Sequence, residues 1–331
     1  MKRLLIFLLL FSNIASAQYD YNQIASQVVD LVENSYVSFE DHIKGKEDYY
    51  YNYFKKELFA DTLSNPDDLI LRLNKYIRFF NDRHLYLSGK DILCENEAFI
   101  DESFESKVLN PNTVYLKINS FKSITNVGRL LKKSLDVDSL NFKNNLIIDL
   151  RDNGGGDYSS SYPLLQFIAT NDIYVRKTKF LVTPENWSFH AKTSRLGEYK
   201  KELEGKIIDT PWERSGDYLV RHYKPYSTYE FPKHVAILVN RNTGSAAEQF
   251  VLYGKQSLKV KIFGENTGGL VDNGSINSYE LIKDKLYLNY ATVKKIDFDQ
   301  NNVSSKGISP DFYLEKDDQI GQILNYLKYW E

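Results

Sequence analysis

The chain has 331 residues, of which 42% are hydrophobic, and this is enough for a large buried core and one to three domains. Its aromatic content of 14% excludes a disordered chain. The formal net charge of −2, from 42 basic and 44 acidic residues, gives no long-range attraction to nucleic acid or to anionic membranes, so we expect neither as a partner. The single cysteine, Cys94, forms no internal disulfide, and core burial must stabilise the fold.

The first residues have the composition of a secretory signal peptide. Residues 1–3 carry positive charge, residues 4–11 are apolar, and Ala15 to Ala17 have the small side chains of a signal-peptidase site. We therefore expect an exported protein, periplasmic or extracellular, with a signal peptide at 1–17 that is cleaved near Ala17. No later stretch approaches the roughly 18 apolar residues that a membrane span requires.

Residues 18 to about 80 are predicted to form amphipathic helices. Apolar residues recur at helical spacing between 24 and 32, and again between 69 and 77. We assign residues 18–100 to an N-terminal helical cap domain. Helical spacing gives way to strand-like alternation after His84. A histidine at such a junction is usually a satisfied polar group, and it becomes a candidate catalytic base only if it has a partner.

From Thr113 onwards the expected strands and helices alternate. A strand at 113–118, a helix at 127–135, a buried strand at 145–150 and a helix at 164–169 predict a crossover unit with parallel strands. Residues 101–331 are therefore predicted to form a second domain of the α/β class. Prolines interrupt the pattern at about 171–233, which we interpret as an irregular insertion that flanks or covers the site, with a two-stranded arm at 173–181.

The strand at 145–150 runs into a glycine-rich loop with the sequence DLRDNGGG, residues 149–156. A loop of this kind at the carboxyl end of a strand directs backbone N–H groups towards the place where open α/β sheets bind ligands. It lacks both the Gly-Lys-Ser/Thr ending and the spacing of a dinucleotide loop, so we expect no nucleotide cofactor. Asp149 and Arg151 are more often a structural pair than catalytic groups.

A strand-to-helix corner is predicted around Ser245. Residues 234–239 have the composition of a strand that is buried on both faces, and residues 245–250 open an apolar helical segment. Asn240, Asn242 and Gly244 are expected to supply the positive φ angles of the intervening turn. A hydroxyl at such a corner lies beside free N–H groups and the positive end of a helix dipole, which suits a nucleophile.

The same residues have a purely structural interpretation. Ser245 and Glu248 match the Ser-x-x-Glu capping box, in which the two residues satisfy each other's backbone donors. The pattern also lacks the glycine that follows the serine in the elbow of α/β-hydrolases. Spacing alone therefore leaves both interpretations open.

The rest of the chain is predicted to form a strand, a second glycine loop, a hairpin and a final helix. The strand covers 260–263, the loop covers 264–269, and the hairpin combines 278–282 with 285–295. Asn273-Gly274 is typical of a tight turn. A helix is expected through residues 320–327.

Four of these segments, taken together in order and spacing, resemble the tail-specific, or carboxyl-terminal processing, serine peptidases. They are DLRDNGGG at 149–156, VNRNTGSAAE at 239–248, GENTG at 264–268 and GISPD at 307–311. The resemblance covers roughly residues 80–315, and the same core occurs in tricorn protease. It implies a crotonase-like ββα spiral core.

The resemblance also implies site residues. Ser245 would attack the peptide carbonyl, and the N–H groups of Ala246 and Gly155 would hold the oxyanion, where one such donor typically contributes about 3 kcal/mol. Glu248, Asp149 and Gly154 would support the site. This chemistry requires neither a cofactor nor a metal.

The chain departs from the better-known members at the base. Those members have a lysine where this chain has Leu270, whereas the tricorn-like branch uses the histidine of an Asp-x-His motif, matched here by Asp82 to His84. His84 is therefore the candidate base for Ser245. That branch has a glutamate at the position of Ser304. Its absence here leaves a weaker dyad, another acid such as Glu280 or Asp272 in its place, or an inactive protein.

These observations predict an exported serine-type endopeptidase or carboxyl-terminal processing peptidase. Its partners would be peptides or unfolded proteins. Too few residues separate His84 from Thr113 for a PDZ domain, so none is expected. The alternative is a catalytically inactive protein on the same fold that binds a peptide or another ligand, as the residues at 270 and 304 would allow.

Overall fold

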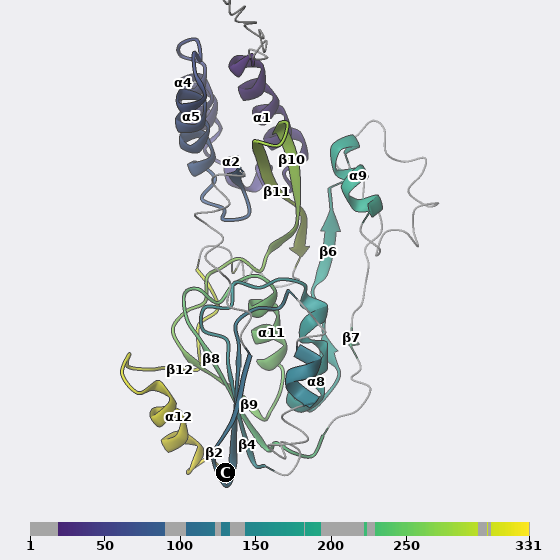
Figure 1. Ribbon diagram of the computed structural model, residues 1–331, viewed down its shortest axis with the longest axis vertical. Coiled ribbons are helices and arrows are strands. Elements are labelled where there is room, and N and C mark those ends of the chain that lie inside the picture. The colour runs from purple at the N-terminus through teal and green to yellow at the C-terminus, as the bar shows by residue number, and fades with distance from the viewer. Residues whose placement is uncertain are drawn as a thin grey trace, which may run out of the picture.

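The computed structural model describes residues 19–89, 104–122, 127–132, 143–181, 183–192, 222–223, 229–296, 303 and 306–330. Figure 1 shows two stacked parts. One part contains the N-terminal helices and a long hairpin, and the other contains a sheet flanked by helices and the C-terminus. The predicted signal peptide, Cys94 and Ser304 lie outside the described residues.

A six-stranded sheet forms the centre of the C-terminal part, in the order β12-β9-β8-β4-β3-β2. Strands β3, β4, β8, β9 and β12 run parallel, and β2 pairs antiparallel with β3. Strands β4 and β8 are buried on both faces, which explains their continuous apolar sequences. The strands are β2 (Phe104–Asn110), β3 (Thr113–Ile118), β4 (Asn145–Asp149), β8 (His234–Val239), β9 (Val260–Gly264) and β12 (Phe312–Tyr313).

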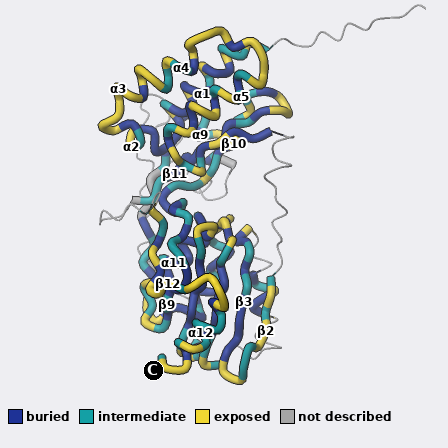
Figure 2. The backbone as a smooth tube through the Cα atoms, turned by 90° about the vertical axis from the view of Figure 1, so that its left-hand side faces the viewer, coloured by how far each residue is buried: buried dark blue, intermediate teal, exposed yellow. Residues whose placement is uncertain are grey.

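Helices cover both faces of this sheet (Figure 1). One face packs against α8 (Tyr162–Ile168) and α11 (Ala246–Gly254), and the 3-10 turn η3 (Tyr158–Ser161) precedes α8. The other face packs against α12 (Gln319–Leu327). In Figure 2 the strands are largely buried and the turns at their ends are exposed. Since β4 and β8 are adjacent and parallel, the loops after their carboxyl ends emerge side by side.

The N-terminal helices form as the apolar spacing predicts. Helix α1 begins where the Asp20 side chain accepts a hydrogen bond from the Gln23 N–H, and α5 begins with Pro66 after Asn65 caps the Asp68 N–H. The elements are α1 (Tyr21–Ser35), α2 (Phe39–Ile43), α3 (Glu47–Tyr49), a π-helical turn η1 (Tyr50–Lys55), α4 (Lys56–Leu58) and α5 (Pro66–Arg78).

These helices share one apolar core with a hairpin from late in the chain. Strands β10 (Asn273–Ile282) and β11 (Leu286–Ile296) form the hairpin, and β1 (Tyr86–Ser88) and β6 (Lys177–Phe180) pair with β11. Side chains of α1 and α5 form a single buried cluster with side chains of the hairpin, among them Leu288 and Tyr290. The cap therefore buries its apolar face against the second half of the sequence.

The predicted α/β class with a parallel sheet is confirmed, and so is the hairpin. Two local predictions are wrong. Asn273-Gly274 is not a turn, because both residues lie in β10 opposite β11. Residues 173–181 do not pair as an arm, because β5 (Ile173–Tyr174) pairs with β7 (His222–Tyr223) whereas β6 pairs with β11. Helix α9 (Pro184–Lys192) follows β6. The division at residues 100 and 101 stays a prediction.

Candidate active site

Ser245 lies between β8 and α11, at the predicted strand-to-helix corner. Its backbone has φ +53° and ψ −117°, a conformation that costs a non-glycine residue about 1–3 kcal/mol. The prediction that Asn240, Asn242 and Gly244 carry the positive φ angles is wrong, since Ser245 itself does. Strain of this kind persists only where the surroundings hold it in place, and it is concentrated at functional sites.

The turn before Ser245 is held by the loop after β4. The side-chain amides of Asn240 and Asn242 both donate to Asp152 Oδ1 at 2.9 Å. The Thr243 hydroxyl donates to the Leu150 carbonyl at 2.8 Å. The two loops at the carboxyl ends of β4 and β8 therefore form one hydrogen-bonded unit.

Glu248 holds the corner from inside the protein. Its buried carboxylate accepts hydrogen bonds from the backbone N–H groups of Ser245 at 3.0 Å, Gly269 at 2.7 Å and Leu270 at 2.7 Å, and from the Thr267 hydroxyl at 2.5 Å. Burial raises the pKa of Glu248, and these four donors partly offset the shift. With its oxygens occupied, Glu248 supports the corner, in the sense of the capping box, and is no base for Ser245.

The glycine loop lies directly against the serine. A Cβ on Gly155 would come within 2.8 Å of the Ser245 Cβ and 2.9 Å of the Ala246 nitrogen, and Gly155 has φ +106°, so no other residue fits. Gly154 is exposed and has open space in front of its Cα. The structure therefore brings four of the predicted site residues together at this corner, namely Ser245, Ala246, Glu248 and Gly155.

Asn153 organises this loop, although the sequence analysis did not single it out. Its Oδ1 accepts the Gly155 N–H at 2.9 Å, its Nδ2 donates to the Ile118 carbonyl at 2.9 Å, and its own carbonyl accepts the Gly244 N–H at 2.9 Å. The sequence signal that could have identified Asn153 was its position directly before three glycines. In this conformation the Gly155 N–H is therefore engaged by Asn153. The Ala246 N–H, by contrast, has no acceptor within the part of the chain that the structure describes.

Leu270 packs beside the serine corner, where the better-known relatives carry a lysine. Its Cδ1 lies 2.9 Å from the position of a Cβ on Gly244. The GISPD segment has a structural role, because the Ile308 N–H donates to the Thr267 hydroxyl oxygen at 2.7 Å and thereby supports the partner of Glu248. Lys255 is not available as a base, since its Nζ pairs with Asp311 at 2.9 Å.

Asp149 lies away from this corner. Its buried carboxylate pairs with Arg151 at 2.6 Å and accepts the Tyr115 hydroxyl at 2.8 Å, and Arg151 reaches Gln319 of α12. The carboxylate therefore braces the α12 side of the sheet, as a structural pair would.

The His84 turn follows α5 and precedes β1. The guanidinium of Arg83 lies 3.3 Å from the position of a Cβ on Gly268, whose N–H donates to the Thr243 carbonyl. The turn therefore adjoins the loops that hold Ser245. The His84 side chain is 12% exposed, and its Nδ1 lies 3.7 Å from Asp82 Oδ1. Burial lowers the pKa of His84, while Asp82 opposes this effect.

The two acids suggested as substitutes for the missing glutamate have other partners. Glu280 accepts hydrogen bonds from the Asp284 N–H and the Tyr287 hydroxyl within the hairpin. Asp272 forms a buried pair with Arg176 at 2.6 Å. Asp82 was overlooked as a candidate, although it stands two residues before His84.

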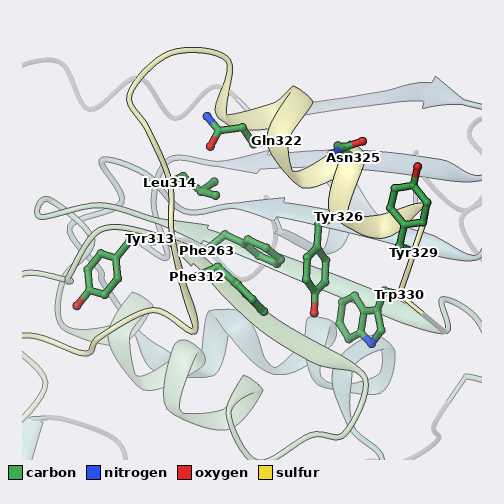
Figure 3. Close-up of a pocket in the computed structure, with 9 residues that line it drawn as sticks. All are labelled: Phe263, Phe312, Tyr313, Leu314, Gln322, Asn325, Tyr326, Tyr329 and Trp330. Atoms are coloured by element: carbon green, nitrogen blue, oxygen red, sulfur yellow. The ribbon is translucent and has the colours of Figure 1, made fainter.

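An aromatic hollow of about 530 Å³ lies elsewhere, between β12 and α12. Figure 3 shows the rings of Phe312, Tyr326 and Trp330 around it. It is on the face of the sheet opposite α11, so it is separate from the Ser245 corner.

The chain is similar to known proteins both in sequence and in fold. A sequence model described as peptidase family S41 matches residues 112–314. A lipoprotein from Streptococcus agalactiae has 17% identity and a TM-score of 0.57, over 96% of this chain and 99% of that chain. A photosystem II D1 C-terminal processing protease has 12% identity and a TM-score of 0.53, over 90% and 94%. Tricorn protease has 13% identity and a TM-score of 0.56, over 93% of this chain and 36% of that one.

Proposed function

Because the chain belongs to peptidase family S41, we propose that it is a serine-type endopeptidase or carboxyl-terminal processing peptidase in which Ser245 is the nucleophile and His84 is the general base. The observation that carries this proposal is the strained backbone of Ser245 at the N-terminus of α11, with Gly155 packed against it. A capping residue needs no positive φ, whereas a nucleophile benefits from a backbone that lifts its hydroxyl out of the turn.

The reaction needs one proton acceptor beside the hydroxyl. His84 would take the Ser245 proton at Nε2 as Oγ attacks the peptide carbonyl, and it would return that proton to the leaving amine. Water then hydrolyses the acyl-enzyme by the same route. The lowered pKa of His84 keeps the imidazole neutral and able to accept this proton at neutral pH.

The oxyanion would lie in the hollow between the glycine loop and α11. The Ala246 N–H is one donor, aided by the positive end of the helix dipole. Gly155 would supply the second N–H after releasing Asn153. Glu248, Asn153 and Gly154 shape this hollow.

The substrates we propose are short or unfolded peptides, met outside the cytoplasm. The expected signal peptide supports export. No helix within the described residues is both long enough and apolar enough to cross a membrane.

An inactive binding protein on the same fold is the second candidate. Leu270 occupies the position where the lysine is expected. It favours this candidate, because its aliphatic side chain beside Gly244 cannot accept a proton from the serine. The aromatic hollow at α12 has a volume in the range of small-ligand sites, roughly 300–1,000 Å³.

A serine-directed fluorophosphonate separates the two functions. We expect it to label the wild type, not to label Ser245→Ala, and to label His84→Ala much more slowly. Leu270→Ala and Lys255→Ala should label like the wild type, because neither side chain takes part in proton transfer. Absence of labelling in a folded wild type would reject the peptidase, and an unchanged rate in His84→Ala would reject His84 as the base.

A further inference from the structure

The carboxylate of Asp82 lies where the cap, the hairpin and the His84 turn meet. Its Oδ2 accepts the hydroxyl of Tyr36, just after α1, at 2.5 Å and the side-chain amide of Asn273, at the start of β10, at 2.7 Å. Its Oδ1 accepts the backbone N–H of His84 at 2.8 Å. Three elements that are distant in sequence therefore fix the position of one carboxylate.

The imidazole of His84 faces this carboxylate with an unpaired nitrogen. Nδ1 is buried and has no hydrogen-bond partner in the described structure, and it lies 3.7 Å from Asp82 Oδ1. A carboxylate oxygen accepts about two hydrogen bonds, and the hydrogen bonds seen here give Oδ1 only one. A movement of about 0.5 Å would bring the two atoms within hydrogen-bond distance.

A buried nitrogen without a hydrogen bond is unfavourable, so the Asp82 contact is the favourable way to satisfy it. Contacts between catalytic groups are often long in unliganded sites and shorten when substrate binds. The other acids suggested by the sequence, Asp272 and Glu280, are already held by their own partners.

We propose that Asp82 is the positioning residue of His84, accepting the Nδ1 proton and leaving Nε2 free to take the proton of Ser245. The proposal rests on the proposed function, in which His84 is the base. As Oγ bonds to the carbonyl carbon, its proton passes to Nε2, and the resulting imidazolium is stabilised by the ionised Asp82. The same proton then leaves with the amine, and Asp82 keeps its charge throughout.

Two charged groups act on His84, and they oppose each other. Asp82 raises the pKa of the imidazole, while Arg83 and burial lower it. Replacing Asp82 with asparagine keeps the shape and removes the negative charge, so the pKa of His84 must fall. Removing the charge lowers that pKa whether Asp82 positions the imidazole or only holds the turn, so the tautomer of His84 is the readout that separates the two roles.

Nitrogen-15 NMR of the histidine side chains in the whole chain tests this without requiring catalysis. The His84 signals are assigned by their loss in His84→Gln. We expect the Nδ1–H tautomer in the wild type, and in Asp82→Asn a loss of that preference together with a lower pKa of His84. Asp272→Asn is the matched control, because it removes a buried carboxylate held by Arg176, and it should change neither quantity. An unchanged tautomer in folded Asp82→Asn would overturn the proposal.

Fluorophosphonate labelling then separates this proposal from the peptidase itself. In Asp82→Asn the labelling rate should fall by about 10²–10⁴. A wild type that labels, with no tautomer change in Asp82→Asn, refutes the role of Asp82 alone. A wild type that does not label, with the tautomer change present, refutes the peptidase and keeps the positioning role.

Two milder variants test the proposal if Asp82→Asn does not fold. Tyr36→Phe and Asn273→Ala each remove one donor to Oδ2 and leave the charge in place. Each should preserve the Nδ1–H tautomer and slow labelling several-fold, because the carboxylate is held less firmly. Full retention of the wild-type rate in both would contradict the tethering of Asp82.

Discussion

Gly155 lies against Ser245 so closely that a methyl group on Gly155 would come within 2.8 Å of the serine Cβ. The two residues come from loops after neighbouring parallel strands, and this contact leaves no room for adjustment, because Gly155 also has φ +106°. The serine corner and the glycine loop must therefore fold as one unit.

Gly155→Ala should disrupt this unit. Strain at positive φ costs about 1–3 kcal/mol, and the steric overlap adds about 1–3 kcal/mol, so the free energy of unfolding should fall by roughly 2–6 kcal/mol. Urea denaturation measures the loss. Gly154→Ala is the matched control, since a Cβ there meets nothing within 4 Å, and its stability should stay near that of the wild type. Equal losses in both variants would contradict the geometry.

The pH dependence of labelling should report a neutral imidazole. Burial lowers the pKa of His84 from its usual 6.5, so the base stays unprotonated to a lower pH. The labelling rate should therefore fall with a midpoint below pH 6.5, as the imidazole gains a proton. Rates measured between pH 4.5 and 8 test this, and a midpoint above 6.5 would exclude a buried His84 as the base.

Glu248→Gln should destabilise the corner while preserving its shape. A neutral amide has one oxygen, so some of the four donors around Glu248 would face an NH₂ group and lose their acceptor. We expect a loss of about 2–4 kcal/mol in the free energy of unfolding. Glu265→Gln, whose carboxylate meets only the exposed Arg241 at 3.7 Å, should change it by less than about 0.5 kcal/mol. Similar values for the two variants would contradict the role of Glu248.

Gln249→Met should make the protein more stable. The Gln249 side chain is in α11 and the residue is 5% exposed, yet neither its oxygen nor its nitrogen has a partner among the described residues. Removing this unpaired amide should raise the free energy of unfolding by about 1–2 kcal/mol. Gln256→Met gives the opposite expectation, because the Gln256 amide exchanges two hydrogen bonds with the backbone of Tyr174. Loss of stability in both variants would show that Gln249 is satisfied in solution.

Local sequence patterns predicted the elements that depend on local physics. The apolar runs at 145–149 and 234–239 form buried strands because both faces of the sheet are covered, and the helices at 21–35 and 66–78 follow their apolar spacing. The proximity of Ser245 to the glycine loop was implied by the resemblance to the serine peptidases, because no local pattern predicted which strands are neighbours.

Features that depend on distant contacts could not be predicted in this way. The positive φ of Ser245 is imposed by Glu248 and by the loop after β4, and a rule for isolated turns assigned it to the asparagines instead. Asn273-Gly274 looks like a turn, but pairing with β11 keeps it extended. The role of Asp82 depends on Tyr36 and Asn273, which are 46 and 191 residues away in sequence.

The shared core of the cap and the hairpin sets an order of events during synthesis. The helices at 21–78 leave the ribosome long before residues 273–296, and until the hairpin arrives their apolar faces have nothing to pack against. Asn273, which holds Asp82, arrives at the same late stage. In the proposed function, a nascent chain therefore carries Ser245 before the turn that holds His84 is complete, and the proposed pair can form only after residues 273–296 have been made.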